Sequence, residues 1–120
     1  MREEVKNWWE KAKADLKTAK KNFEVEEYEA SALFCQQSVE KGLKALSIKR
    51  FKGFKKVHDL VVLGREVELP DEFINMCKEL SPAYTYTRYP DVSRIKNIRK
   101  VSEELINYAE KVLEWIEKTL

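Results

Sequence analysis

One short segment of this chain gathers side chains that can bind phosphate groups and bases. Between Tyr84 and Asp91 the sequence reads Tyr-Thr-Tyr-Thr-Arg-Tyr-Pro-Asp. Arg88 offers a planar, permanently charged fork for phosphate oxygens, and the tyrosines can stack on a base or donate a hydroxyl. Pro90 disfavours helical geometry at the residue before it. The segment is therefore predicted to be a loop or helix exit that carries binding groups, or a packed turn in which Arg88 pairs with Asp91.

A single histidine and a basic stretch provide a second set of candidates. His58 is the only histidine, and imidazole changes its charge near neutral pH, which makes His58 a candidate acid–base group; a lone histidine at a helix start is more often structural. It follows the segment Lys49–Lys56, which has five basic residues in eight and two phenylalanines. Such a segment can bind phosphates and stack bases, although more often it is a connector whose rings pack on the core.

Several other kinds of site leave no signal in the sequence. Histidine, cysteine and carboxylates show no metal-ligand spacing, and there is no glycine-rich phosphate loop and no GxSxG nucleophile turn. We therefore expect neither a metal nor a cofactor. The net charge of the 120 residues is only +2, which does not demand a nucleic-acid partner.

Hydrophobic spacing predicts the helices that must position these groups. Apolar residues recur at intervals of three and four, which predicts helices at 3–23, 26–50, 58–67, from 71 to about 80, and 98–119. Three glycines and three prolines are too few for an all-β domain built on turns. We predict an all-α, up-and-down helical bundle of four long helices plus one short helix. It forms a single domain over residues 1–120.

The second predicted helix adds polar candidates. Gln37, Lys41 and Lys44 lie four and three residues apart and so share one face. Glu40 is spaced to pair with Lys44, for a stabilisation of roughly 0.3 kcal/mol. A charged helix face of this kind is usually just solvated. If the helix lies beside the loop of Arg88, both lysines line the same open, positively charged cleft.

The first predicted helix carries one acid at the edge of its apolar face. Asp15 lies one heptad after Trp8, and an unpaired buried carboxylate is costly. We expect Asp15 to reach water beside Lys11.

The cysteines and the amino terminus favour a cytoplasmic protein. Cys35 and Cys77 have no CxxC spacing, and a reduced compartment is the simplest reading. The charged amino terminus lacks a signal-peptide core, and no apolar run is long enough to span a membrane.

Taken together, the motifs resemble a known family. The chain is similar to the HEPN domain (higher eukaryotes and prokaryotes nucleotide-binding) over nearly its whole length, in Ala30-x-x-Leu33-Phe34-x-Gln36-Gln37-x-x-Glu40-Lys41-x-Leu43-Lys44-Ala45, in His58-Asp59-Leu60 and in Thr87-Arg88-Tyr89-Pro90-Asp91. The resemblance implies a five-helix bundle that usually forms a homodimer. It also implies association with nucleotides or RNA, often beside a minimal nucleotidyltransferase encoded nearby in a toxin–antitoxin-like pair. Gln37 becomes a candidate ligand-binding residue on the same ground.

One departure from the family bears on catalysis. HEPN members that cleave RNA carry an arginine, four to six residues and then a histidine, late in the fold. Here no histidine follows Arg88, and seven residues separate Arg50 from His58. We therefore expect a non-catalytic, nucleotide-binding or nucleic-acid-associated protein. Its expected ligand-binding residues are Arg88, Tyr89, Asp91, Tyr84, Lys41, Lys44, Gln37 and His58.

Two other hypotheses remain open. The first is a dimeric protein-interaction module with a purely structural Arg-Tyr-Pro-Asp motif, in which Arg88 pairs with Asp91, Asp15 or Glu40 inside the bundle. The second is a HEPN ribonuclease that uses His58.

Overall fold

Helices make up most of the chain. The computed structural model describes residues 2–90 and 95–120. The helices in these ranges are α1 (Glu3–Glu24), α2 (Tyr28–Phe51), α3 (Leu60–Glu66), α4 (Asp71–Leu80), α5 (Ala83–Tyr86) and α6 (Ile98–Thr119), and the same ranges contain no strand. The predicted all-α bundle is confirmed.

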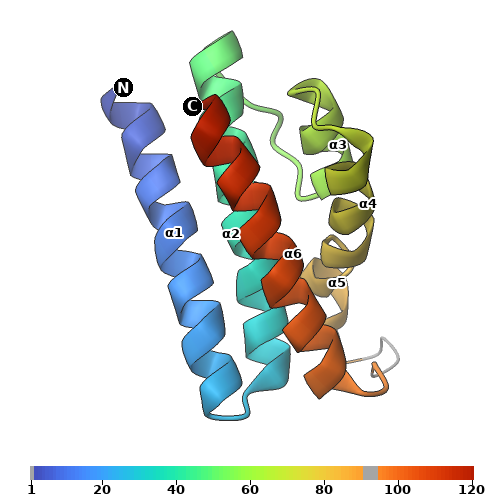
Figure 1. Cartoon of the computed structure of the whole chain (residues 1–120). Coiled ribbons are helices and arrows are strands. Elements are labelled where there is room, and N and C mark those ends of the chain that lie inside the picture. The colour runs from blue at the N-terminus through green and yellow to red at the C-terminus, as the bar shows by residue number, and fades with distance from the viewer. Residues whose placement is uncertain (1, 91–94) are drawn as a thin grey trace.

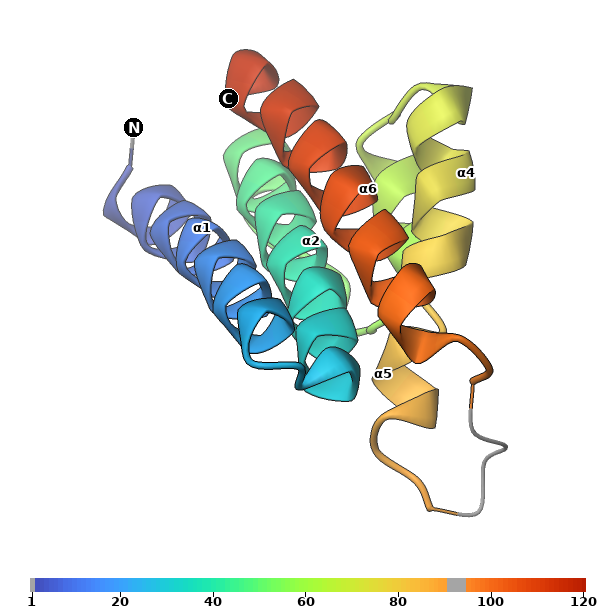
Figure 2. The ribbon, with the colours of Figure 1, turned by 60° about the horizontal axis from the view of Figure 1, so that its bottom comes forward.

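The four longest helices alternate in direction along the chain. α1 and α4 run one way, and α2 and α6 run the other (Figure 1). α2 and α6 therefore lie parallel and side by side, with α1 on one side and α3 and α4 on the other (Figure 2). Contacts at both ends fix this pairing. Ser102 Oγ donates to the Tyr28 carbonyl at 2.6 Å where the two helices begin, and Lys49 Nζ donates to the Leu120 carbonyl where they end.

α2 is the central helix, and buried residues lie around most of its circumference. Its residues Ala32, Val39 and Leu43 are all fully buried. Gly42 allows α6 to approach closely, since a Cβ at this position would lie 2.8 Å from Leu113 Cδ2. The prediction that the second helix contacts several neighbours is thus confirmed.

Most helix bounds follow the predictions, with two informative differences. α3 begins at Leu60 and not at 58, because the Asp59 side chain accepts a hydrogen bond from the Val61 amide at 2.9 Å and caps the helix. The tyrosine-rich segment begins in the one-turn helix α5, so irregular chain starts only at Thr87. No helix within the described ranges is long and apolar enough to cross a membrane.

Candidate ligand-binding site

His58, Tyr84 and Arg88 form a stack at the surface where α2, α3 and α5 meet. The rings of His58 and Tyr84 are nearly parallel, at 15°, with centroids 4.1 Å apart. The guanidinium carbon of Arg88 lies 4.3 Å from the centroid of Tyr84. Arg88 itself is exposed. Stacking holds the guanidinium against the ring, and its N–H donors stay accessible at the rim.

A buried carboxylate fixes the orientation of the imidazole. His58 Nδ1 lies 3.0 and 3.1 Å from the two carboxylate oxygens of Glu40, whose exposed fraction is 6%. A carboxylate accepts hydrogen bonds, so Nδ1 must carry the proton, and in the neutral ring Nε2 is the acceptor. Gln36 Nε2 bonds both Glu40, at 3.0 Å, and the carbonyl of His58, at 3.1 Å. Glu40 therefore fixes the side chain of His58, and Gln36 fixes its backbone.

The same carboxylate is charged at neutral pH despite its burial. Burial acts to raise the pKa of Glu40, but hydrogen bonds from Lys44, Gln36 and His58 outweigh it and lower the pKa below its ordinary value of 4.5. Lys44 Nζ donates to Glu40 at 3.0 Å and is only 5% exposed. The Lys44 ammonium also lies 4.9 Å from the ring of Phe54 and 5.9 Å from that of Trp8. This buried ion pair is therefore enclosed by aromatic rings.

A hollow of about 430 Å³ opens beside the stack. It is lined by His58, Asp59, Val61, Lys78, Ser81, Pro82, Tyr84 and Thr85. Lys78 and Asp59 bring opposite charges to its wall, and Ser81 Oγ already accepts from the Leu60 amide at 3.0 Å. The hollow has the size of a small-molecule site, without a strong positive charge of its own. Within the described ranges, no group of three His, Cys, Asp or Glu residues could hold a metal ion.

Comparison with protein families settles what kind of domain presents this surface. The family model of the HEPN domain matches residues 5–119. The chain belongs to the HEPN domain family. Among curated proteins no significant match is found.

Solved structures support the same conclusion. TT1696 from Thermus thermophilus superposes with a TM-score of 0.89 at 26% identity, over 99% of this chain and 100% of that one. ST0689, an archaeal HEPN homologue, gives 0.80 at 27% identity, over 99% and 98%. A HEPN domain protein from Thermotoga maritima, tm0613, gives 0.77 at 29% identity, over 94% and 96%.

Two lysines of the HEPN motif lie elsewhere than predicted. Lys44 is buried against Glu40, and Lys41 forms an ion pair with Asp15 on α1. Neither lysine lines the hollow. The predicted positively lined cleft is therefore wrong, because both cations are neutralised by acids that the bundle buries. Asp15 lies beside Lys11 as expected, with Nζ and Oδ1 3.5 Å apart, but the expectation that it reaches water is wrong, since this residue is 1% exposed.

The remaining predicted residues divide between the stack and its surroundings. Gln37 donates to Gln36 Oε1 at 2.6 Å and so supports the Glu40 cluster from outside. Tyr89 is 52% exposed beside Arg88. The Tyr86 hydroxyl points inward, with no hydrogen-bond partner in the described ranges, and burial raises the pKa of this residue to about 12. Tyr86 therefore cannot present its hydroxyl to a ligand. Asp91 lies outside the described residues.

The hypothesis of a purely structural Arg88 names Asp91, Asp15 or Glu40 as its partner, and the structure excludes two of these three residues. Asp15 is bound to Lys41, and Glu40 is bound to Lys44 and His58. Because Arg88 is exposed and pairs with no carboxylate in the described ranges, pairing inside the bundle with either acid is wrong. The third partner, Asp91, belongs to the part of the chain that the structure does not describe.

Sequence reasoning did not identify the residues that position the stack. Gln36 was assigned no role of its own, and Glu40 was considered only as a partner of Lys44 or of Arg88, not as the partner of His58. A signal was nevertheless present. Gln36, Glu40 and Lys44 are polar residues at successive intervals of four, and each directly follows an apolar residue of the stripe that forms the core. Such a row, once buried, must satisfy its own hydrogen bonds.

Proposed function

We propose that this HEPN protein binds the phosphate of a nucleotide or of single-stranded RNA at the surface formed by His58, Tyr84 and Arg88. The observation that carries the proposal is the exposed guanidinium of Arg88, centred 4.3 Å from the ring of Tyr84, beside a hollow of about 430 Å³. Arg88 approaches the phosphate with at least two N–H donors. Lys78 supplies a second cation from the wall of the hollow.

The tyrosines take different roles in this proposal. His58 and Arg88 already cover much of the face of Tyr84, so Tyr84 acts as a support for the other two groups. A base stacks instead on Tyr89, the exposed ring next to Arg88. In this proposal the site binds one phosphate group and stacks on the face of one base. It makes no hydrogen bonds to base edges that would select a sequence.

The test is isothermal titration calorimetry with AMP, ATP and a short oligoadenylate. Replacing Arg88 by alanine removes a charged hydrogen-bond donor, which typically weakens binding by about 10- to 100-fold. Arg65→Ala is the matched control, because Arg65 is another exposed arginine and lies outside the lining of the hollow. Wild-type binding no tighter than about 1 mM for all three probes would overturn the proposal.

A second candidate function, RNA cleavage, is favoured by one feature of the fold. The Arg-x4-6-His motif is absent, yet an arginine and a carboxylate-oriented histidine contact the same tyrosine ring. His58 Nε2 would take the proton of a ribose 2′-hydroxyl. The 2′ oxygen would then attack phosphorus and the bond to the 5′ oxygen would break, giving a 2′,3′-cyclic phosphate. The 5′ oxygen would take a proton from water, and His58 would return its own proton to solvent. Arg88 would stabilise the charge on the phosphate.

Cleavage of an end-labelled RNA separates the two functions. If the protein is a nuclease, His58→Ala abolishes cleavage even at RNA concentrations that restore saturation of the variant, while Arg65→Ala cleaves like the wild type. RNA that is bound but stays intact with the wild type would rule out the nuclease and leave the binding proposal standing.

We also propose that the ligand-binding surface operates together with a minimal nucleotidyltransferase, as the family resemblance implies. An exposed arginine beside an open hollow can accept a nucleotide that a second protein presents. Co-expression with the product of a neighbouring nucleotidyltransferase gene should yield a complex that Arg88→Ala weakens. Separate elution of the two wild-type proteins would contradict this pairing.

A further inference from the structure

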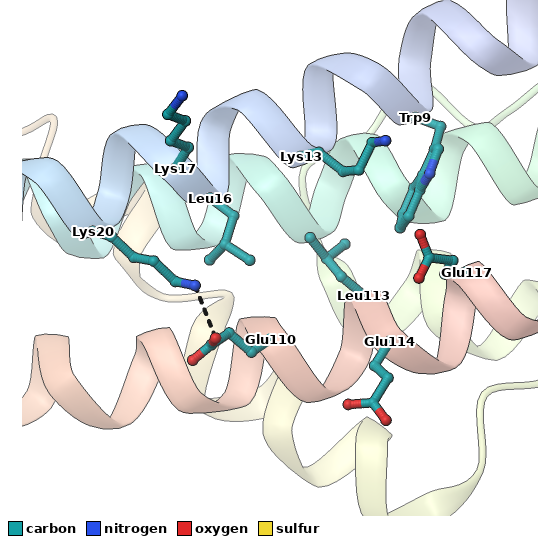
Figure 3. A pocket seen from close by; sticks show the side chains of 9 residues that line it. All are labelled: Trp9, Lys13, Leu16, Lys17, Lys20, Glu110, Leu113, Glu114 and Glu117. Atoms are coloured by element: carbon teal, nitrogen blue, oxygen red, sulfur yellow. Dashed lines mark hydrogen bonds and ion pairs between the residues drawn. The ribbon is translucent and has the colours of Figure 1, made fainter.

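Two neighbouring tryptophans of α1 face different sides of the bundle. Residues that are adjacent on a helix point about 100° apart. Trp9 lies at the groove between α1 and α6, as Figure 3 shows, and is 6% exposed. Trp8 packs edge-on against Phe54, with ring centroids 4.9 Å apart, and is only half-buried. Packing in the core therefore accounts for Trp9 but leaves part of the Trp8 ring open.

The open part of Trp8 lines a second hollow, of about 230 Å³. Asn7 and Lys11 also line it from α1, and Lys41 lines it from α2. Its lining within the described ranges contains two lysines and no acid. Small-molecule sites usually have volumes of roughly 300–1,000 Å³. This hollow is smaller, so it suits one part of a ligand, such as a single base, better than a whole nucleotide.

A buried carboxylate beside the hollow holds both lysines in place. Asp15 is 1% exposed and forms an ion pair with Lys41, and Lys11 Nζ lies 3.5 Å from its other oxygen. One negative charge between two ammonium groups leaves one positive charge in excess. The side chain of Lys11 is 62% exposed, so an anion in solvent can reach this excess charge.

A short chain of contacts joins the hollow to the candidate ligand-binding site. The ring centroid of Trp8 lies 5.9 Å from Lys44 Nζ, which donates to Glu40 Oε2 at 3.0 Å. The same carboxylate oxygen lies 3.1 Å from His58 Nδ1. Binding sites for single-stranded nucleic acid hold roughly 4–16 nucleotides. One short strand can therefore contact both the site at His58 and the ring of Trp8.

We propose that Trp8 and Lys11 form a second nucleotide subsite, and that the ligand is a single-stranded oligonucleotide and not a mononucleotide. The inference rests on the proposed function, because Arg88 holds one phosphate of the strand. A base stacks on the open part of Trp8, and Lys11 binds the phosphate next to that base. Two linked contacts bind one strand more tightly than either contact alone, since the second forms within the same complex.

The first test compares ligands of different length by isothermal titration calorimetry. Wild type should bind oligoadenylates at least about 10-fold more tightly than AMP once the strand reaches both subsites. Trp8→Leu removes the stacking surface and should weaken oligoadenylate binding by about 5- to 150-fold, with AMP binding unchanged. Trp115→Leu is the matched control, because Trp115 is also half-buried beside a phenylalanine and lies outside this hollow. It should bind every ligand like the wild type.

A second variant removes the charge of the subsite without touching the core. Lys11→Ala leaves Asp15 paired with Lys41. The salt dependence of oligoadenylate binding, plotted as the logarithm of affinity against the logarithm of salt concentration, should become shallower by about 0.7. The slope for AMP should not change. Lys17→Ala is the control, since Lys17 is an exposed lysine of the same helix that lines the groove toward α6 (Figure 3).

Tryptophan fluorescence reports on the stacking contact directly. The chain has three tryptophans, so Trp9→Phe with Trp115→Phe leaves Trp8 as the only one, and a bound oligoadenylate should quench its emission. Circular dichroism melts verify that each variant is folded. Oligoadenylates that bind no more tightly than AMP, equal oligoadenylate affinity of Trp8→Leu and Trp115→Leu, or binding without quenching would each overturn the inference. Unchanged AMP binding by Arg88→Ala would instead contradict the proposed function, so the two failures are distinguishable.

Discussion

Two lysine–glutamate pairs of nearly equal length lie in opposite environments. Lys44 and Glu40 are 3.0 Å apart, and their side chains are 6% and 8% exposed. Lys20 and Glu110 are 2.8 Å apart, with 46% and 44% exposed. The two pairs have nearly the same length and differ in their exposure to solvent. Water can replace the partner of an exposed charge at little cost, whereas a buried charge that loses its partner has nothing to replace it.

This difference suits each region to a different task. Hydrogen bonds hold the side chains of Gln36, Lys44 and His58 around the Glu40 carboxylate in one arrangement. This arrangement fixes the orientation of the imidazole in the candidate site. Between α1 and α6, lysines and glutamates lie exposed, and water can take the place of a partner at little cost. The first region can support a ligand site that needs fixed geometry. The second can rearrange its side chains without disturbing the fold.

The largest effect is expected from breaking the buried pair. Glu40→Ala leaves the Lys44 ammonium without its carboxylate at 5% exposure. Removing one partner of a buried ion pair typically lowers the free energy of unfolding by about 3–5 kcal/mol. Urea denaturation followed by circular dichroism measures this change. The imidazole also loses its anchor, so nucleotide binding should weaken together with stability.

The matched control removes both charges. Glu40→Leu combined with Lys44→Met leaves no buried charge unpaired, and much of the lost stability should return. Glu110→Ala is the exposed counterpart and should change stability by about 1 kcal/mol or less. A Glu40→Ala variant as stable as Glu110→Ala would show that the buried cluster is not the rigid region that the comparison requires.

Acid provides a second way to break the same cluster. Because the pKa of Glu40 is lower in the folded protein than its ordinary value of 4.5, its charge stabilises the fold fully above about pH 4.5. That contribution is lost as the pH falls from there through the lowered pKa. Wild type should therefore be more stable than Glu40→Gln at neutral pH, and the difference should shrink in acid. A difference that stays constant down to pH 3 would contradict the assignment.

The sequence predicted the helices better than it predicted the site, for a physical reason. α4 and α6 were placed correctly because Pro70 marks the start of one and an apolar repeat runs the length of the other. Such signals are local. The contact between Glu40 and His58 joins residues 18 positions apart, and nothing within one turn of either residue specifies it.

Burial of the charged residues was also not predictable from spacing alone. The interval of four between Glu40 and Lys44 correctly indicated a pair, but the same interval serves exposed and buried pairs equally. Trp8 of α1 and the segment between α2 and α3, through Phe54 and His58, cover this pair. Spacing along α2 does not specify these neighbours. Likewise, Lys41 was correctly placed on the polar side of α2, yet its partner Asp15 comes from a different helix.

The smallest effect is expected at the exposed pair, where a double-mutant cycle sharpens the comparison. Lys20→Ala, Glu110→Ala and the double variant should give a coupling energy of about 0.2–1 kcal/mol in dilute solution, and it should fall further in high salt. The equivalent cycle on Glu40 and Lys44 should give a larger coupling that salt barely changes, because water and ions do not reach the pair. Equal couplings with equal salt dependence would mean that burial does not separate the two regions. The Lys20–Glu110 pair would then be as fixed as the cluster beneath His58, although water reaches both of its side chains.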